Sequence, residues 1–107
     1  MDAMVEAAVA CMHGRFGDPL TVAEIAQNAG LGLFDFSRLF KEETGVSPGK
    51  FLDAVRIGEA RKLLDSTSMS VTEISRAAGY DGLDSFADAF TAGVGLSPGR
   101  YRRDCIG

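Results

Sequence analysis

Cysteine and histidine are scarce in this chain of 107 residues, and tryptophan is absent. The two cysteines, Cys11 and Cys105, stand near opposite ends, no CxxC spacing occurs, and the single histidine is His13. This is too little for a zinc site or a disulfide framework, so we expect two free thiols, no metal and no cofactor. Residues i and i+2 of a helix do not face each other, so Cys11 and His13 form no catalytic pair. Without a catalytic triad or a phosphate loop, we expect a protein that is not an enzyme.

Long apolar runs are also missing. No uninterrupted apolar stretch approaches the roughly 18–20 residues that a membrane helix needs. The first ten residues carry acids at Asp2 and Glu6 and no basic residue, which argues against a secretory signal peptide. Apolar residues make up 46% and charged residues 24% of the chain, as in folded soluble proteins with one compact core or two small ones. We therefore expect a cytoplasmic protein with no membrane partner.

Positive charge is in deficit, with a net charge of −4. Residues 1–46 carry most of this excess, with three basic against seven acidic residues. Domains that bind nucleic acid are usually basic. DNA binding by this chain would therefore require its basic residues to share one face, and it would be weak on non-specific DNA and steeply dependent on salt.

What the sequence does contain is an internal duplication. Residues 20–30, LTVAEIAQNAG, match residues 69–79, MSVTEISRAAG, at an offset of 49 residues. Residues 36–51, FSRLFKEETGVSPGKF, match residues 86–101, FADAFTAGVGLSPGRY, at an offset of 50 residues. The one-residue difference falls between the two blocks, where a turn tolerates insertion. The duplication predicts two units built to the same plan.

Each copy carries signals that begin and end helices. The first helix of each copy would start at a capping box and end at a glycine: Thr21-x-x-Glu24 with Gly30, and Ser70-x-x-Glu73 with Gly79. The second would bury apolar residues at i, i+3 and i+4 and stop at a glycine: Phe36, Leu39, Phe40 and Gly45, and Phe86, Ala89, Phe90 and Gly95. A Ser-Pro pair would then start a third helix, at Ser47-Pro48 and Ser97-Pro98. Two short helices joined by a tight turn make a helix-turn-helix.

Three further segments predict helices. Residues 2–13 have apolar positions on one face and end at Gly14, residues 48–65 give the longest helix, and a short one runs from Pro98 toward Asp104. No segment alternates with period two, so we expect no strand. The predicted fold is all-α, with seven helices. Two helix-turn-helix subdomains, residues 1–47 and 66–107, are joined by a long central helix at residues 48–65.

These patterns resemble the C-terminal DNA-binding domain of the AraC/XylS-type bacterial transcriptional regulators, from about Met4 to Arg103. The residues that carry the resemblance are LTVAEIAQNAGL, FSRLFKEETGVSPGKFL, RIGEARKLLDST and VTEISRAAGYDGLDSF…F…GLSPGRYR. Two helix-turn-helix patterns, joined by a long helix and each followed by G-x-S-P, are specific to this family. The resemblance implies that the second helix of each unit enters the major groove of DNA. The long helix would set their separation to about one turn of the duplex, roughly 34 Å.

In the first copy, the family's base-reading positions fall on four residues: Phe34, Asp35, Ser37 and Arg38. Arg38 suits the O6 and N7 atoms of guanine, and Phe34 suits a thymine methyl group. Lys41 and Lys50 are placed for DNA phosphates. The alternative for Arg38 and Lys41 is a solvated helix face.

The second copy departs from this pattern. Its matching helix face reads Leu83, Asp84, Ser85 and Asp88, with Asp88 in place of Arg38 and Thr91 in place of Lys41. A carboxylate there can accept a hydrogen bond from cytosine N4, but it also faces a polyanion. Positive charge returns at three residues that we interpret as phosphate contacts: Arg100, Arg102 and Arg103. We expect the first copy to carry most of the specificity and the second to hold DNA backbone or protein.

The predicted function is sequence-specific binding of double-stranded DNA in the regulation of bacterial transcription, by a domain that is monomeric in isolation. The alternative is a helical interaction module that docks on a protein such as RNA polymerase and binds DNA weakly. Family members usually carry a separate effector-sensing or dimerisation domain, which favours a domain excised from a longer regulator over a free-standing member. The promoter, the effector and the direction of regulation are not encoded in these patterns.

Overall fold

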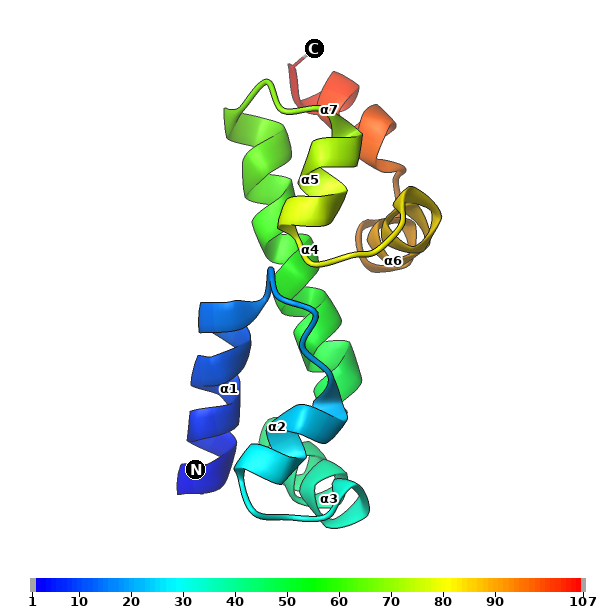
Figure 1. Ribbon diagram of the computed structural model, residues 1–107. Helices are drawn as coiled ribbons and strands as arrows, with labels where there is room; N and C mark the ends of the chain where they lie inside the picture. Colours follow the sequence, from blue (N-terminus) through cyan, green and yellow to red (C-terminus); the bar gives the residue numbers. More distant parts are fainter. Residues whose placement is uncertain (1, 107) are drawn as a thin grey trace. The chain divides into compact units, whose positions relative to one another are not determined.

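Seven helices make up most of the residues that the structure describes, and no strand occurs among those residues (Figure 1). The structure, a computed structural model, describes residues 2–106 of the chain, with side chains as far as Asp104. The helices are α1 (Ala3–Arg15), α2 (Val22–Asn28), α3 (Leu33–Thr44), α4 (Pro48–Ser66), α5 (Val71–Ala77), α6 (Leu83–Val94) and α7 (Pro98–Ile106). The predicted all-α fold with seven helices is confirmed.

The chain divides into two compact units, and the division falls inside α4, between Val55 and Arg56. Unit 1 holds α1, α2, α3 and the first turns of α4, and unit 2 holds the rest of α4 with α5, α6 and α7. The helix α4, which covers the predicted linking helix at residues 48–65, thus contributes one end to each unit.

The helix ends follow the predicted signals in most places. Gly45 and Gly95 end α3 and α6 in the left-handed conformation, with φ of 84° and 91°. This conformation is sterically unfavourable for a residue with a Cβ atom. Ser70 and Glu73 form a complete capping box, with both hydrogen bonds at 3.1 Å. At the start of α2, Thr21 Oγ1 accepts from the Glu24 amide at 3.1 Å, and the described contacts include no return bond to the Thr21 amide.

Gly14 does not end α1, contrary to the prediction. The helix continues through Gly14 to Arg15, and its C-cap is Phe16 in the right-handed region. A glycine ends a helix when it adopts a positive φ, and Gly14 does not do so. The other end of α1 is capped by Asp2, whose Oδ1 accepts from the Met4 amide at 2.7 Å.

The core of unit 1 is formed by one face of each of its helices and contains a group of packed aromatic rings. Its buried residues are Val5, Ala8, Met12, Leu20, Ile25, Ala26, Phe36, Phe40 and Leu52. The Phe36 and Phe40 rings lie 5.7 Å apart between centroids, and Phe51 meets Phe40 edge-on at 5.3 Å. The exposed His13 ring lies edge-on to Phe51, with 6.3 Å between the ring centroids, so the single histidine lies at the edge of this aromatic group.

Unit 2 repeats this arrangement. Its buried residues are Ile57, Ala60, Leu64, Ile74, Ala78, Phe86, Phe90 and Tyr101. Phe86 and Phe90 are 5.7 Å apart, and Tyr101 meets Phe90 edge-on at 5.5 Å, as Phe51 meets Phe40 in unit 1. The duplicated residues therefore build the same aromatic core twice.

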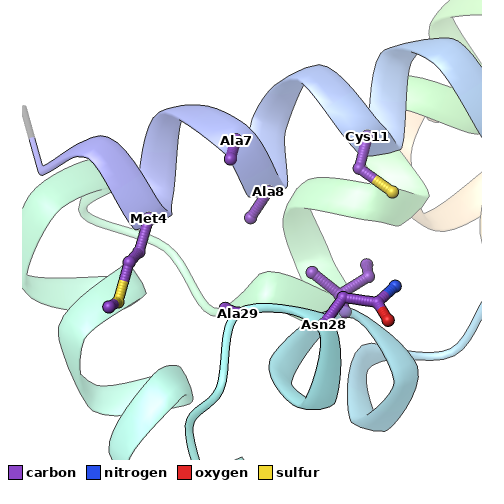
Figure 2. A pocket seen from close by; sticks show the side chains of 7 residues that line it. Met4, Ala7, Ala8, Cys11, Asn28 and Ala29 are labelled. Atoms are coloured by element: carbon purple, nitrogen blue, oxygen red, sulfur yellow. The ribbon is translucent and has the colours of Figure 1, made fainter.

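A small hollow lies between α1 and α2 in unit 1 (Figure 2). It is lined by Met4, Ala7, Ala8, Cys11, Ile25, Asn28 and Ala29. Its volume of about 80 Å³ is well below that of a site for an organic ligand. Cys11 is a free, half-buried thiol on its wall, whereas the side chain of Cys105 lies outside the described residues.

Candidate nucleic-acid interface

The second helix of unit 1, α3, has a fully buried face and a strongly exposed one. Phe36 and Phe40 are 0% exposed, which fixes the rotation of the helix on the core. On the outer face, Phe34 is 77% exposed, an unusual state for a side chain whose burial would be favourable. Arg38 and Lys41 are also exposed and follow Phe34 at i+4 and i+7. The three side chains therefore form one row along the helix.

Two other predicted base-reading residues lie beside this row. Asp35 forms an ion pair with Arg38, with Oδ1 and Nη2 3.7 Å apart and both side chains mostly in solvent. Ser37 is half-buried, so it presents less of its side chain than its neighbours do. The structure thus brings Phe34, Asp35 and Arg38 together on an open surface.

Lys50 and Arg100 occupy equivalent places in the two units. Each lies in the first turn of a helix that a Ser-Pro pair starts, and each is exposed. The Lys50 amide donates to Ser47 Oγ at 3.4 Å, and the Arg100 amide donates to Ser97 Oγ at 3.3 Å. A basic side chain at the amino end of a helix lies next to backbone N–H groups that also attract anions.

The outer face of α6 has the opposite charge character. Leu83 is 43% exposed, and the side chains of Asp84, Ser85, Asp88 and Thr91 are exposed as well. Residues 77–99 contain no Lys, Arg or His. The helix that corresponds to α3 therefore offers carboxylates and no cation.

Arg102, predicted from the sequence as a phosphate contact, lies against the backbone of its own unit. Its half-buried guanidinium donates to three backbone carbonyls, those of Leu64 (3.3 Å), Thr67 (3.2 Å) and Met69. These carbonyls follow one another where α4 ends and the connection to α5 begins. Arg102 therefore stabilises the loop, whereas its neighbour Arg103 is exposed.

The repeat contains the signal that identifies Arg102. At the offset of 50 residues, Arg102 matches Leu52, which is a core residue of unit 1. A side chain at a core position points inward. The N–H donors of Arg102 therefore meet backbone carbonyls of unit 2. At the same offset, Arg100 and Arg103 match the charged residues Lys50 and Asp53. The residue-by-residue alignment of the two copies therefore distinguishes Arg102 from both of its basic neighbours.

Further basic residues of unit 2 pack against tyrosine rings, which sequence reasoning missed. The Arg56 guanidinium lies 5.7 Å from the centre of the Tyr80 ring, and the Arg61 guanidinium lies 5.5 Å from that of Tyr101. The Tyr101 hydroxyl also donates to Asp65 at 3.2 Å. These arginines take part in cation–π contacts within the unit.

The described part of the chain shows no group of three or more His, Cys, Asp or Glu side chains that would hold a metal ion. No helix in that part is both long enough and apolar enough to cross a membrane.

Comparisons with known proteins agree with this geometry. A family model described as a helix-turn-helix domain matches residues 21–104. The HTH-type transcriptional regulator Rv1931c of Mycobacterium tuberculosis is 32% identical over 91 residues, which make up 85% of this chain and 35% of that protein. This chain thus spans about a third of the length of that relative.

Two solved structures are similar over almost the whole chain. The C-terminal domain of AraT, a response regulator from Geobacillus stearothermophilus, has a TM-score of 0.93 at 32% identity, over 96% of this chain and 86% of that one. The DNA-binding domain of AdpA, a global transcriptional factor solved in complex with a target DNA, has a TM-score of 0.91 at 25% identity. That likeness covers 96% of this chain and 93% of the AdpA chain.

Proposed function

Because this chain belongs to the AraC-type family of helix-turn-helix DNA-binding domains, we propose that it reads double-stranded DNA mainly through the outer face of α3. The family resemblance predicted from the sequence is confirmed. The observation that carries the proposal is the exposed row of Phe34, Arg38 and Lys41 on a helix whose other face is buried. The domain would act by binding alone, in the bacterial cytoplasm, to regulate transcription.

The row on α3 has the chemistry of base reading in the major groove. The Arg38 guanidinium offers the planar fork that matches O6 and N7 of guanine. One turn earlier, the exposed Phe34 ring suits the methyl group of thymine. Such an apolar contact also explains why a phenylalanine stays in solvent in the absence of DNA.

Phosphate contacts are assigned to four exposed cations: Lys41, Lys50, Arg100 and Arg103. If each neutralises one phosphate, the logarithm of the binding constant would fall with the logarithm of salt at a slope of about −4. The net charge of −4 makes other, non-specific contacts few.

A second role is favoured by the surface of α6, which exposes Leu83 together with Asp84 and Asp88. A carboxylate near phosphates weakens DNA binding, whereas it strengthens contact with a basic protein surface. We propose that unit 2 adds backbone contacts through α7, and that α6 is free to contact protein, for example RNA polymerase.

The first experiment is selection from a pool of random duplexes at two salt concentrations, with sequencing of the retained DNA. We expect a motif with one well-specified major-groove window that contains a guanine. Arg38→Ala should lose roughly 5- to 100-fold in affinity for that motif and relax the choice at the guanine. Lys41→Ala should weaken all duplexes alike and reduce the salt slope by about 1. Retention of no preferred sequence at low salt would overturn the proposal.

A test of α6 is Asp88→Arg. If α6 lies near DNA, this change should raise affinity and steepen the salt slope. Unchanged affinity and slope would show that α6 does not approach the duplex.

A further inference from the structure

The pair formed by Asp35 and Arg38 is too exposed to be explained by stability. The two side chains are 62% and 65% exposed, and the charged atoms are 3.7 Å apart. Ion pairs between side chains that are mostly in solvent contribute little to folding stability. The pair nevertheless lies at the centre of the surface that we assign to base reading, so its effect on Arg38 is the relevant one.

The helix also favours the charge of Asp35. This residue lies in the first turn of α3, where the N-cap is Gly32 and no side chain caps the backbone N–H groups. A carboxylate in that turn interacts favourably with the positive end of the helix dipole. Asp35 is therefore a charged acceptor at the amino end of α3, three residues before Arg38.

The internal duplication shows that this fold forms its second helix without the pair. In α6, Ser85 takes the place of Asp35 and Asp88 takes the place of Arg38, so both members of the pair differ. The buried aromatic residues of the two helices are the same, Phe36 and Phe40 matching Phe86 and Phe90. Unit 2 keeps the core and loses the pair, as expected if the pair serves reading and not folding.

We propose that Asp35 is a positioning residue for Arg38 and does not itself read a base. This inference rests on the proposed function of α3. An arginine side chain loses rotamer entropy when it is fixed, and its bidentate contact with guanine requires one orientation of the guanidinium. A carboxylate that holds one Nη group before DNA arrives restricts the side chain in advance and so sharpens the choice of guanine.

The same carboxylate repels phosphates, so Asp35 has two effects of opposite sign. It lowers affinity for every duplex by its charge, and it raises discrimination at the guanine through Arg38. A residue that is merely structural, or merely a solvated acid, does not produce this combination.

The test compares Asp35→Asn with Glu42→Gln. Glu42 is exposed on the same face of α3, four residues after Arg38, but the described ion pair of Arg38 is with Asp35 and not with Glu42. The Glu42 variant therefore removes the same charge and leaves the Asp35–Arg38 pair in place. Dissociation constants are measured for the selected duplex, for the same duplex with adenine in place of the guanine, and for a random duplex. Thermal unfolding of each variant confirms that the fold is intact.

We expect Asp35→Asn to bind the random duplex a few-fold more tightly and to lose roughly 2- to 5-fold in preference for guanine over adenine. Glu42→Gln should bind all three duplexes more tightly by one common factor. Asp35→Glu, which keeps the charge, should recover part of the preference. In an Arg38→Ala background, Asp35→Asn should leave the remaining preference unchanged.

If Asp35→Asn behaves like Glu42→Gln, with the guanine preference intact, Asp35 is only a solvated acid and the inference is wrong. That result would leave the proposed function untouched, since the wild-type preference and its loss in Arg38→Ala would remain. A wild-type protein with no sequence preference would overturn the proposed function, and this inference with it.

Discussion

Arginine residues that are neighbours in sequence have different surroundings in unit 2. Arg102 binds carbonyls in the last turn of α4 and in the connection after it, Arg103 is exposed, and Arg100 lies 4.0 Å from Asp104. On a helix, successive residues point about 100° apart, so one arginine faces the unit while the next faces solvent. Charge in a sequence therefore locates a basic segment, and helical phase decides which of its residues are available to a ligand.

The role of Arg102 predicts a stability loss that its neighbour does not share. Arg102→Ala leaves three carbonyls without their charged donor, and we expect it to reduce the free energy of unfolding by about 1–3 kcal/mol. Arg102→Lys has a single ammonium group in place of the planar fork, so it should recover only part of this. Urea unfolding measures the free energy of unfolding of both variants. Arg103→Ala is the control, because it removes the same charge. A loss in Arg103→Ala as large as that in Arg102→Ala would show that general charge is responsible.

At the scale of the helix, two glycines near the end of α6 should respond to replacement by alanine with opposite changes in stability. Gly93 is inside the helix, and a Cβ atom there would lie 3.9 Å from Ile57 Cγ2, an ordinary contact. Gly95 is the C-cap with φ of 91°. We expect Gly93→Ala to stabilise the protein by about 1 kcal/mol and Gly95→Ala to destabilise it by about 1–2 kcal/mol. Thermal unfolding of the two variants checks the signs, and a gain in Gly95→Ala would contradict the assigned cap.

The capping box of α5 predicts a dependence on pH. The Ser70 backbone amide, which donates to the Glu73 carboxylate, and the Ser70 side chain lower the pKa of Glu73 from its ordinary value of 4.5. A lowered pKa means that the folded state binds fewer protons than the unfolded state. The stabilisation is therefore complete above pH 4.5 and is lost as the pH falls through the lower folded value.

Glu73→Gln tests this, because glutamine can keep the capping geometry without the charge. We expect the melting temperature of the variant to lie below that of the wild type at pH 7 and to converge with it once the pH falls below the lowered folded pKa of Glu73. Glu24→Gln in α2 is the matched control, since Thr21 lacks the return bond there, and its difference from wild type should be smaller. A difference in melting temperature between wild type and Glu73→Gln that stays constant with pH would rule out the carboxylate as its cause.

Helices and their caps were predictable because each depends on a few adjacent residues. The Ser-Pro starts, the glycine stops and the shared aromatic positions all appear in the structure where the duplication placed them. The end of α1 was not predictable from Gly14, because a glycine permits a left-handed stop without requiring one. The contacts of Arg102 and the pairing of Asp35 with Arg38 depend on side-chain direction, which composition does not report.

At the scale of the whole molecule, residues 2–104 form two hydrophobic cores that share no buried residue. One consists of residues from Val5 to Leu52 and the other of residues from Ile57 to Tyr101. The two duplicated units therefore each bury a pair of phenylalanines. We propose base reading only for unit 1, whose second helix carries basic residues. The stability of each unit should then respond to its own core.

Phe90→Ala and Phe40→Ala test this separation. Both rings are 0% exposed and occupy the same place in their units, so each truncation should cost about 3–5 kcal/mol. We expect Phe90→Ala to reduce amide hydrogen-exchange protection in α5, α6 and α7 while leaving α1, α2 and α3 unchanged, and Phe40→Ala to do the reverse. Equal loss of protection in both units, from either variant, would mean that the molecule unfolds as one cooperative body. In that case a mutation far from α3 would weaken DNA reading through stability alone.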